Sequence, residues 1–384
     1  MRRQADEIAA DPALRAYGAA LALLQVLAAY WIQRDGKLAL LVPGRGAICW
    51  PLLPDCEWLR VLPLGALEVA ASAWALSGLA VAAAFGRRGW AKRAFVGLLL
   101  LTLCEVALLA LDFRLRRNQH YMALWVTGAF LLVPGKRRAL PLLICGFYFW
   151  SGTLKLNWEW LSGAALYRPV WLFTGLWLVL ACAYVIVLEL VLVWGLLARR
   201  AWLFWGAFAQ LVVFHIFLWP VLMFGILAIF PLCRLLPGPP APSPRAAFAL
   251  AALFAVFQLT PHLLPGDRVL TGEGRLFALH MFDAQVACEA WAEVRLADGG
   301  VLRESLLRHG EARTACDPIL IHGFARNLCR ARDAGRVDFV DFDVHLRSRR
   351  ATEAELRTVI ELPDFCEVRP HYNPFWHNRW IRVD

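Results

Sequence analysis

Long apolar runs separated by short polar segments occupy roughly the first two thirds of the chain. A helix needs roughly 20 mainly apolar residues to cross a membrane, and fewer when it is buried among other helices. Two of the runs are short, and Pro220 before the second of these indicates a kink in one broken helix. The pattern therefore predicts eight or nine spans. The segments are Ala16–Ile32, Leu67–Phe85, Ala94–Leu111, Tyr121–Val133, Leu140–Leu154, Val170–Leu197, Ala201–Trp219, Val221–Leu232 and Ala246–Leu263.

The pattern changes at about residue 266, where Arg, Asp, Glu and His become frequent. Asp298-Gly299-Gly300 is a hairpin signal between two strand-like segments, and Asp317-Pro318 is typical of a helix start. We therefore expect a mostly α protein, with a polytopic transmembrane helical bundle (residues 1–265) followed by a small α+β soluble domain (residues 266–384). The predicted elements of that domain are strands at Leu276–Phe282, Ala287–Leu296, Val301–Leu307 and Val337–Leu346, and a helix from Pro318 to about Arg332.

Composition supports a membrane protein. The chain is 60% hydrophobic and 18% charged, with a mean hydropathy of +0.53, whereas soluble domains are about a quarter charged. A net charge of +10 would raise nucleic acid as a partner of a soluble protein. Here the basic residues lie in short clusters between apolar runs. Membrane orientation or contact with anionic lipid explains them better, so we expect membrane lipid as a partner and no nucleic acid.

Three basic clusters fall on one side of the membrane if the spans alternate, and this side is then cytoplasmic. A fourth cluster falls on the other side and breaks the rule. We expect a multi-pass protein of the cell (inner) membrane with a cytoplasmic N-terminus. Nine crossings place the soluble domain outside the cytoplasm, and eight place it inside. The three agreeing clusters are 87–93, 136–138 and 199–200, and the exception is 114–117.

Six cysteines lie in the first loop or in the soluble domain, and an even number favours an oxidising, extracytoplasmic location for both. Their pairing is open; one hypothesis is a bridge between the first loop and the soluble domain, and the alternative is six reduced thiols. No Cys-x-x-Cys is present, so we expect no metal site. The six are Cys49, Cys56, Cys288, Cys316, Cys329 and Cys366.

Polar residues interrupt the apolar runs, and such groups at membrane depth usually face a cavity or one another. Lys155, at the end of a run, is interpreted as a general base or an anion anchor, or alternatively as a lysine that extends to the headgroups. Glu189 would need a partner such as Lys155, His215 or an arginine. Together these residues predict a polar pocket in the bundle. They are Glu68, Glu105, Asp112, Gln119, His120, Lys155, Glu189, Gln210 and His215.

Two motifs resemble a known family. Asn118-Gln119-His120-Tyr121 opens a short predicted span, and a second motif has the form Tyr-x-x-x-Gly-x-x-Lys-Leu-x-x-x-Trp. Both resemble the horizontally transferred transmembrane (HTTM) domain, the membrane half of vitamin K-dependent gamma-carboxylase. The order of Glu189, Arg199-Arg200 and His215 also fits that family, as do Met281-Phe282 and the Asp-Pro helix. The second motif comprises Tyr148, Gly152, Lys155, Leu156 and Trp160.

The resemblance implies that Lys155 is the base that starts oxidation of a hydroquinone by oxygen, assisted by His120. The strong base so generated would remove a proton from glutamate, and carbon dioxide would add. A reduced, vitamin K-like quinone is the implied cofactor, with a pocket formed by Tyr148, Trp160, Glu189 and His215. The family's Trp-x-Met-Met strand reads Leu279-His280-Met281-Phe282 here, without the Trp.

Two other functions remain open from the sequence. One is a non-catalytic membrane scaffold or maturation factor that binds an exported protein or peptide through its outer domain. The other is a small-molecule transporter, which the lack of an inverted repeat of hydrophobic segments disfavours. No Walker A, GxSxG or HExxH motif points to a different enzyme class.

Overall fold

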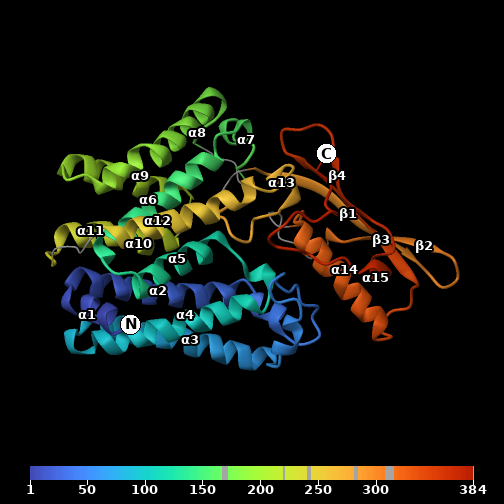
Figure 1. Cartoon of the computed structure of the whole chain (residues 1–384), viewed down its shortest axis with the longest axis horizontal. Helices are drawn as coiled ribbons and strands as arrows, with labels where there is room; N and C mark the ends of the chain where they lie inside the picture. Colours follow the sequence, from blue (N-terminus) through green and yellow to red (C-terminus); the bar gives the residue numbers. More distant parts are fainter. Residues whose placement is uncertain (167–171, 219–220, 240–243, 281–283, 308–314, 384) are drawn as a thin grey trace.

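The computed structural model describes residues 1–166, 172–218, 221–239, 244–280, 284–307 and 315–383. A large helical part contains the N-terminus, and a smaller part with a sheet contains the C-terminus, side by side along the longest axis (Figure 1). The helices of the first part are α1 (Arg2–Ala10), α2 (Pro12–Arg34), α3 (Leu64–Gly86), α4 (Ala91–Ala110), α5 (Asn118–Leu132), α6 (Lys136–Leu154), α7 (Trp158–Leu161), α8 (Gly175–Leu190), α9 (Ala201–Leu218), α10 (Val221–Leu227), α11 (Ile229–Leu235) and α12 (Arg245–Leu259).

Four helical segments among the described residues are long and apolar enough to cross a membrane. Each has 23 residues, or about 34 Å at 1.5 Å per residue, which exceeds the roughly 30 Å hydrocarbon layer. They are Pro12–Arg34, Leu64–Gly86, Arg88–Ala110 and Gly175–Leu197.

The prediction of eight or nine spans is therefore not supported. The other five predicted segments form helices that are shorter or more polar than these four. For example, α5 has 15 residues and α12 has 15, while α6 begins with three basic residues. The predicted span after Pro220 forms two helices of seven residues each, α10 and α11; Pro220 itself lies outside the described residues.

Large apolar side chains remain exposed along the helical part, as expected of a surface that faces lipid rather than water. On α3, for example, Val69 is 70% exposed, and on α8 Trp177 is 71% exposed. A separate set of buried residues, from Ile8 to Phe254, forms the interior of the bundle. The four apolar helices and this exposed apolar surface indicate a membrane protein.

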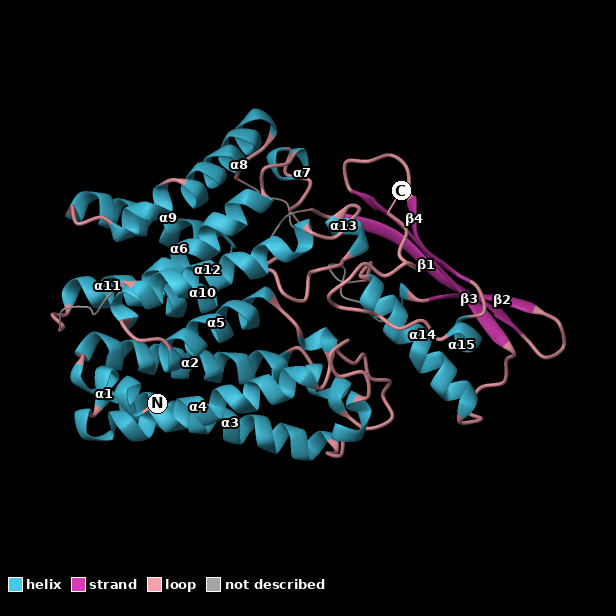
Figure 2. Ribbon diagram, in the orientation of Figure 1, coloured by secondary structure: helices cyan, strands magenta, loops and turns pink. Residues whose placement is uncertain are grey.

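The smaller part is a four-stranded antiparallel sheet with α14 (Pro318–Asp333) packed along it (Figure 2). The strand order is β2-β1-β3-β4. The alternating residues Phe342, Val344 and Leu346 are buried in the shared core. The remaining elements are α13 (Arg268–Thr271), β1 (Val286–Arg295), β2 (Val301–Ser305), β3 (Asp341–Arg350), β4 (Arg357–Leu362) and α15 (Phe365–Val368).

Local signals explain most of these elements. Asp317 caps α14 by accepting a hydrogen bond from the Ile319 N–H at 3.0 Å, and Pro318 takes the first helical position. Gly299, with φ of 84°, makes the turn between β1 and β2. The predicted strand at Leu276–Phe282 is wrong: residues 276–278 form a turn and a bend, residues 279–280 have no regular secondary structure, and Met281 and Phe282 lie outside the described residues. The predicted strand at Val337–Leu346 begins later, at Asp341, and β4 was not predicted.

Three disulfides use the six predicted cysteines, in the pairs Cys49–Cys56, Cys288–Cys316 and Cys329–Cys366. The hypothetical bridge between the first loop and the soluble part is therefore wrong, because Cys49 and Cys56 are close enough in the same loop to pair with each other. Noncovalent contacts hold the first loop against the soluble part instead. Asn327 donates a hydrogen bond to the Ala47 carbonyl at 2.9 Å, and Arg330 forms an ion pair with Asp55 at 3.1 Å.

The basic clusters divide between the two ends of the bundle. At one end, α1 ties two of the predicted cytoplasmic clusters together, since Lys92 pairs with Asp6 at 2.5 Å and Lys136 with Glu7 at 3.2 Å. Residues of the second and third clusters line one cleft at this end.

The cluster 114–117, which broke the orientation rule, lies at the opposite end beside the soluble part. Arg114 pairs with Asp112 and Arg117 with Asp35, both at 2.7 Å, and Arg116 donates to the Arg275 carbonyl. Carboxylates and carbonyls thus compensate these arginines, which explains why the cluster departs from the charge rule.

Candidate functional site

Tyr148, Ser151 and Lys155 lie at positions i, i+3 and i+7 at the end of α6, so a helix places them on one face. Lys155 is the residue that ends the helix, with its backbone still in the right-handed helical region. All three side chains point into the bundle and are buried. The spacing of the motif therefore produces a polar stripe on the inner face of an otherwise apolar helix.

The Lys155 ammonium is fully buried, and it donates to Glu189 Oε2 at 2.5 Å, to Ser151 Oγ at 2.5 Å and to the Ser151 carbonyl at 3.3 Å. Glu189, near the end of α8, is 1% exposed. The interpretation of Lys155 as a lysine that extends to the headgroups is wrong, because its charge is compensated inside the protein. Of the partners considered for Glu189, the structure selects Lys155.

Gly152 allows α6 and α8 to approach closely enough for this ion pair. A Cβ atom at this position would lie 3.0 Å from Glu189 Cβ and 2.9 Å from Leu190 Cδ2. Any larger residue would force the two helices apart. The glycine of the motif thus has a packing role that sequence reasoning did not assign.

Tyr148 and His215 form a second contact beside the ion pair. The Tyr148 hydroxyl and His215 Nε2 are 2.5 Å apart. His215 Nδ1 is buried and has no hydrogen-bond partner among the described residues. Lys155 acts electrostatically on His215, and Glu189 on Tyr148, so the two contacts belong to one site.

Trp160 covers the lysine from α7. Its ring centroid lies 5.1 Å from Lys155 Nζ, and its indole N–H donates to the Cys182 carbonyl on α8 at 2.9 Å. An aromatic ring over an ammonium stabilises the cation and excludes water. The structure therefore brings together Lys155, Glu189 and Trp160, with Tyr148 and His215 adjacent.

The soluble part is clamped onto this site through Glu159, next to Trp160. Arg350, at the end of β3, pairs with Glu159 at 3.0 Å and with Asp267 at 2.6 Å, and Thr352 also donates to Glu159 at 3.3 Å. The hydrogen bonds to Asp267 raise the pKa of Arg350 above its usual value. Arg350 thus links the sheet directly to α7, the short helix that follows the lysine.

His120 belongs to a different network. Its Nδ1 lies 3.0 Å from Glu105 Oε1, Gln25 donates to the other Glu105 oxygen at 2.6 Å, and Trp74 donates to Gln25 at 3.1 Å. These residues come from α5, α4, α2 and α3. The structure therefore pairs His120 with Glu105 rather than with Lys155, and its role as a helper of Lys155 stays a prediction.

The expectation of one polar pocket formed by all nine residues is wrong. Asp112 is bound by Arg60 and Arg114 near the first loop, and Gln210 accepts a hydrogen bond from Tyr184 on the outer surface of the bundle. The set is therefore divided among several local networks.

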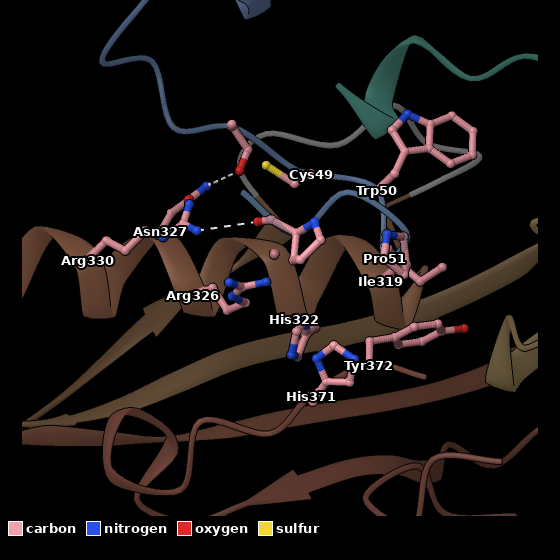
Figure 3. A pocket seen from close by; sticks show the side chains of 13 residues that line it. Cys49, Trp50, Pro51, Ile319, His322, Arg326, Asn327, Arg330, His371 and Tyr372 are labelled. Atoms are coloured by element: carbon pink, nitrogen blue, oxygen red, sulfur yellow. Dashed lines mark hydrogen bonds between the residues drawn. The ribbon is translucent and has the colours of Figure 1, made fainter. Parts of the chain in front are cut away.

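A second cleft lies between the first loop and α14 (Figure 3). Arg326 and Arg330 extend from the helix, and His322 and His371 also line the cleft. Burial lowers the pKa of His322 to about 4, so this side chain is neutral at neutral pH and the arginines supply the positive charge. Arg330 is already paired with Asp55. The sequence analysis did not identify this cleft.

Two groups of described residues, both with members on the sheet, have ligand atoms within 4.8 Å of one another, as a metal site would require. One comprises Asp341, Asp364 and Glu367, and the other comprises Glu293, Asp343 and His345. However, Asp343 Oδ1 already accepts hydrogen bonds from Arg295 at 2.7 Å and from the Asp364 N–H at 3.0 Å. The arrangement therefore fits stabilisation of the sheet, and it gives no support for a metal.

Sequence reasoning missed several residues of the site. Ser151 lies one helical turn before Lys155, so the spacing alone would have found it. Arg350 and Asp267 are far from Lys155 in sequence and carried no local signal. Comparison of the chain with protein-family models, curated proteins and solved structures found no match.

Proposed function

We propose that the chain is a multi-pass membrane enzyme that oxidises a reduced quinone with oxygen at Lys155, with chemistry resembling that of vitamin K-dependent gamma-carboxylase. The observation that carries the proposal is the Lys155–Glu189 pair, with Tyr148 and His215 beside it. A charged pair inside a bundle is costly, and an intramembrane ionisable group is a functional hypothesis by default.

The ion pair provides a route to a neutral, basic lysine. Movement of one proton along the 2.5 Å hydrogen bond from Lys155 Nζ to Glu189 leaves a neutral amine and a neutral acid. Burial lowers the cost of this proton transfer, because the neutral pair contains no desolvated charges. The amine can then accept a proton from a hydroxyl group within hydrogen-bond reach. Trp160, which is 2% exposed, keeps water from competing for that proton.

The residues around the pair fit a quinol. The buried Nδ1 atom of His215 has no partner among the described residues and suits a ligand oxygen, and Phe214 and Phe224 pack against the His215 ring. When bound, a reduced quinone would supply the two electrons that reduce oxygen and, if the likeness to the carboxylase extends to the substrate, would drive the replacement of a glutamyl proton by carbon dioxide. Ser151, Glu189 and Trp160 hold and orient the lysine.

Features at the two ends of the molecule support the proposed location. The three disulfides lie in the first loop and the soluble part, which favours an oxidising compartment for that end. The basic clusters at the other end favour the cytoplasm. We therefore place α1 on the cytoplasmic side of the cell (inner) membrane and the sheet outside it, where an exported protein or peptide would reach Lys155 from the outer face.

The test is to purify the protein from membranes and identify bound quinones by mass spectrometry. Lys155→Met should lose the quinone. Lys136 is the matched control, because it is also a fully buried lysine paired with a glutamate, and Lys136→Met should retain the quinone. The double variant Lys155→Met/Glu189→Gln removes both charges together and guards against misfolding caused by one unpaired charge. Absence of quinone from the folded wild type would disprove the proposal.

A non-catalytic maturation factor is the second candidate, and the cleft beside α14 favours it (Figure 3). The cleft would suit an acidic segment of an exported protein, because Arg326 supplies positive charge there. His371 and Tyr372 of the C-terminal tail also line it. In that case Lys155→Met should leave client maturation unchanged, whereas Arg326→Gln should impair it. The opposite result would favour the enzyme.

A further inference from the structure

A cleft of about 500 Å³ opens at the end of the bundle opposite the soluble part. The N-terminal ends of α6 and α12, the C-terminal end of α11 and the segment that joins α8 to α9 line it. These segments are distant in sequence, and the cleft exists only because the bundle brings their ends together. It lies apart from Lys155, which is at the other end of α6.

The rim of the cleft is basic. Arg137, Arg138, Arg199 and Arg234 line it, and no carboxylate among the described residues does. Arg137 is held in place, with Nε 2.5 Å from Asp11 Oδ2 and Nη1 donating to the Cys233 carbonyl at 3.1 Å. The other three arginines are exposed. The rim therefore carries four arginines, of which Arg137 is paired with Asp11.

The wall of the cleft is apolar. Phe204 and Phe230 are buried in it, while Leu197 is 44% and Phe248 is 63% exposed. Arg234 lies against this wall, with its guanidinium 5.4 Å from the Phe204 ring centroid. A hydrocarbon surface directly below a row of guanidinium groups matches the two halves of an anionic amphiphile.

We propose that this cleft binds an anionic glycerophospholipid from the membrane leaflet at this end, with its phosphate on Arg138, Arg199 and Arg234 and an acyl chain on the wall at Phe248. The occupant is argued from charge complementarity and from the apolar wall of the cleft, because basic pockets between membrane helices bind acidic headgroups. The inference rests on the membrane placement of the proposed function, and it is independent of the chemistry at Lys155.

The experiment is native mass spectrometry of the full chain in detergent, titrated with dioleoylphosphatidylglycerol or dioleoylphosphatidylcholine. The wild type should retain the anionic lipid preferentially. Arg138→Gln/Arg199→Gln should weaken its retention on the order of 30-fold, since each basic group near an anionic surface contributes about a factor of five. Arg87→Gln/Arg88→Gln makes the same change of charge in exposed residues outside the cleft and should leave retention unchanged.

Two further arms separate lipid from a free anion. Phe248→Gln should weaken retention of the lipid without any change of charge, and excess inorganic phosphate should fail to displace it. Equal retention of both lipids, an unchanged cleft double variant, or displacement by phosphate would each overturn the proposal. Bound quinone is measured in the same spectra, so failure here is distinguishable from failure of the redox function.

Discussion

Two buried polar networks in the helical part differ in how they compensate charge. Around Lys155, an ammonium faces a carboxylate directly at 2.5 Å. Around His120, Glu105 receives a hydrogen bond from the neutral amide of Gln25 and contacts an imidazole. The comparison indicates that the Lys155 network joins an amine directly to a carboxyl group, whereas in the His120 network an amide and an imidazole surround the carboxyl group.

Both networks lie at the end of the bundle that contacts the soluble part, but the connections differ. Arg350 reaches the Lys155 side through two carboxylates. On the His120 side, the Tyr121 hydroxyl donates to the Phe277 carbonyl at 2.6 Å and accepts from Gln258 at 2.9 Å. One connection is ionic and the other is built from neutral hydrogen bonds. Substitutions, packing changes and acid should therefore affect the two connections differently.

Replacing the glutamate of each network with glutamine should produce the largest difference in stability. Glu189→Gln leaves the Lys155 ammonium buried without a counter-charge and should cost about 3–5 kcal/mol of unfolding free energy. Glu105→Gln keeps an oxygen acceptor and should cost about 1 kcal/mol. Thermal unfolding of the purified variants in detergent measures both. An equal loss of stability in the two variants would show that His120 is also charged.

We call the connection of Arg350 with Glu159 and Asp267 the ionic clamp. It should contribute more to the free energy of unfolding than the neutral connection through Tyr121. Arg350→Gln removes hydrogen bonds between charged groups and should cost about 1.5–3 kcal/mol, whereas Tyr121→Phe should cost about 1 kcal/mol. Limited proteolysis between the helical and soluble parts, together with thermal unfolding, reads out the loosening. If Tyr121→Phe loosens the two parts as much as Arg350→Gln does, the ionic clamp is not the main connection.

Helix packing offers a third contrast, between two glycines. A Cβ at Gly152 would meet Glu189 and Leu190, so Gly152→Ala should destabilise the protein by about 1–3 kcal/mol. Gly128, on the helix that carries His120, has open space around it. Gly128→Ala should therefore stabilise by about 0.5–1 kcal/mol. The melting temperatures should move in opposite directions, and a shift of the same sign in both would contradict the close approach of α6 and α8.

Of the two connections, acid should weaken the ionic clamp and not the Tyr121 hydrogen bonds. We expect this effect on stability to be the smallest of the four. Burial tends to raise the pKa of Asp267, but hydrogen bonds from Arg350 and from the Val269 N–H outweigh it and hold the pKa below the usual 3.8. A carboxyl with a lowered folded pKa stabilises the fold above its unfolded pKa and loses that contribution as the pH falls through the folded pKa.

The melting temperature of the wild type should therefore fall more steeply below about pH 4 than that of Arg350→Gln. Tyr121→Phe is the control and should retain the steep dependence of the wild type. Parallel curves for wild type and Arg350→Gln would show that Asp267 does not depend on Arg350.

The sequence by itself determined the features that rest on local spacing. Tyr148 and Lys155 share a face because a helix repeats every 3.6 residues, Asp317-Pro318 starts a helix, and Gly299 allows a tight turn. The apolar runs predicted helices, and four of these are long enough to cross a membrane.

Only the tertiary structure decided the partners. Gln25 meets Glu105 across 80 positions and Arg350 meets Glu159 across 191, and no local pattern contains such pairs. The same holds for the disulfide pairing, for the separation of His120 from Lys155, and for the basic cleft. The physical reason is that a buried polar group must be compensated by whatever donor or acceptor the packing of distant segments places beside it.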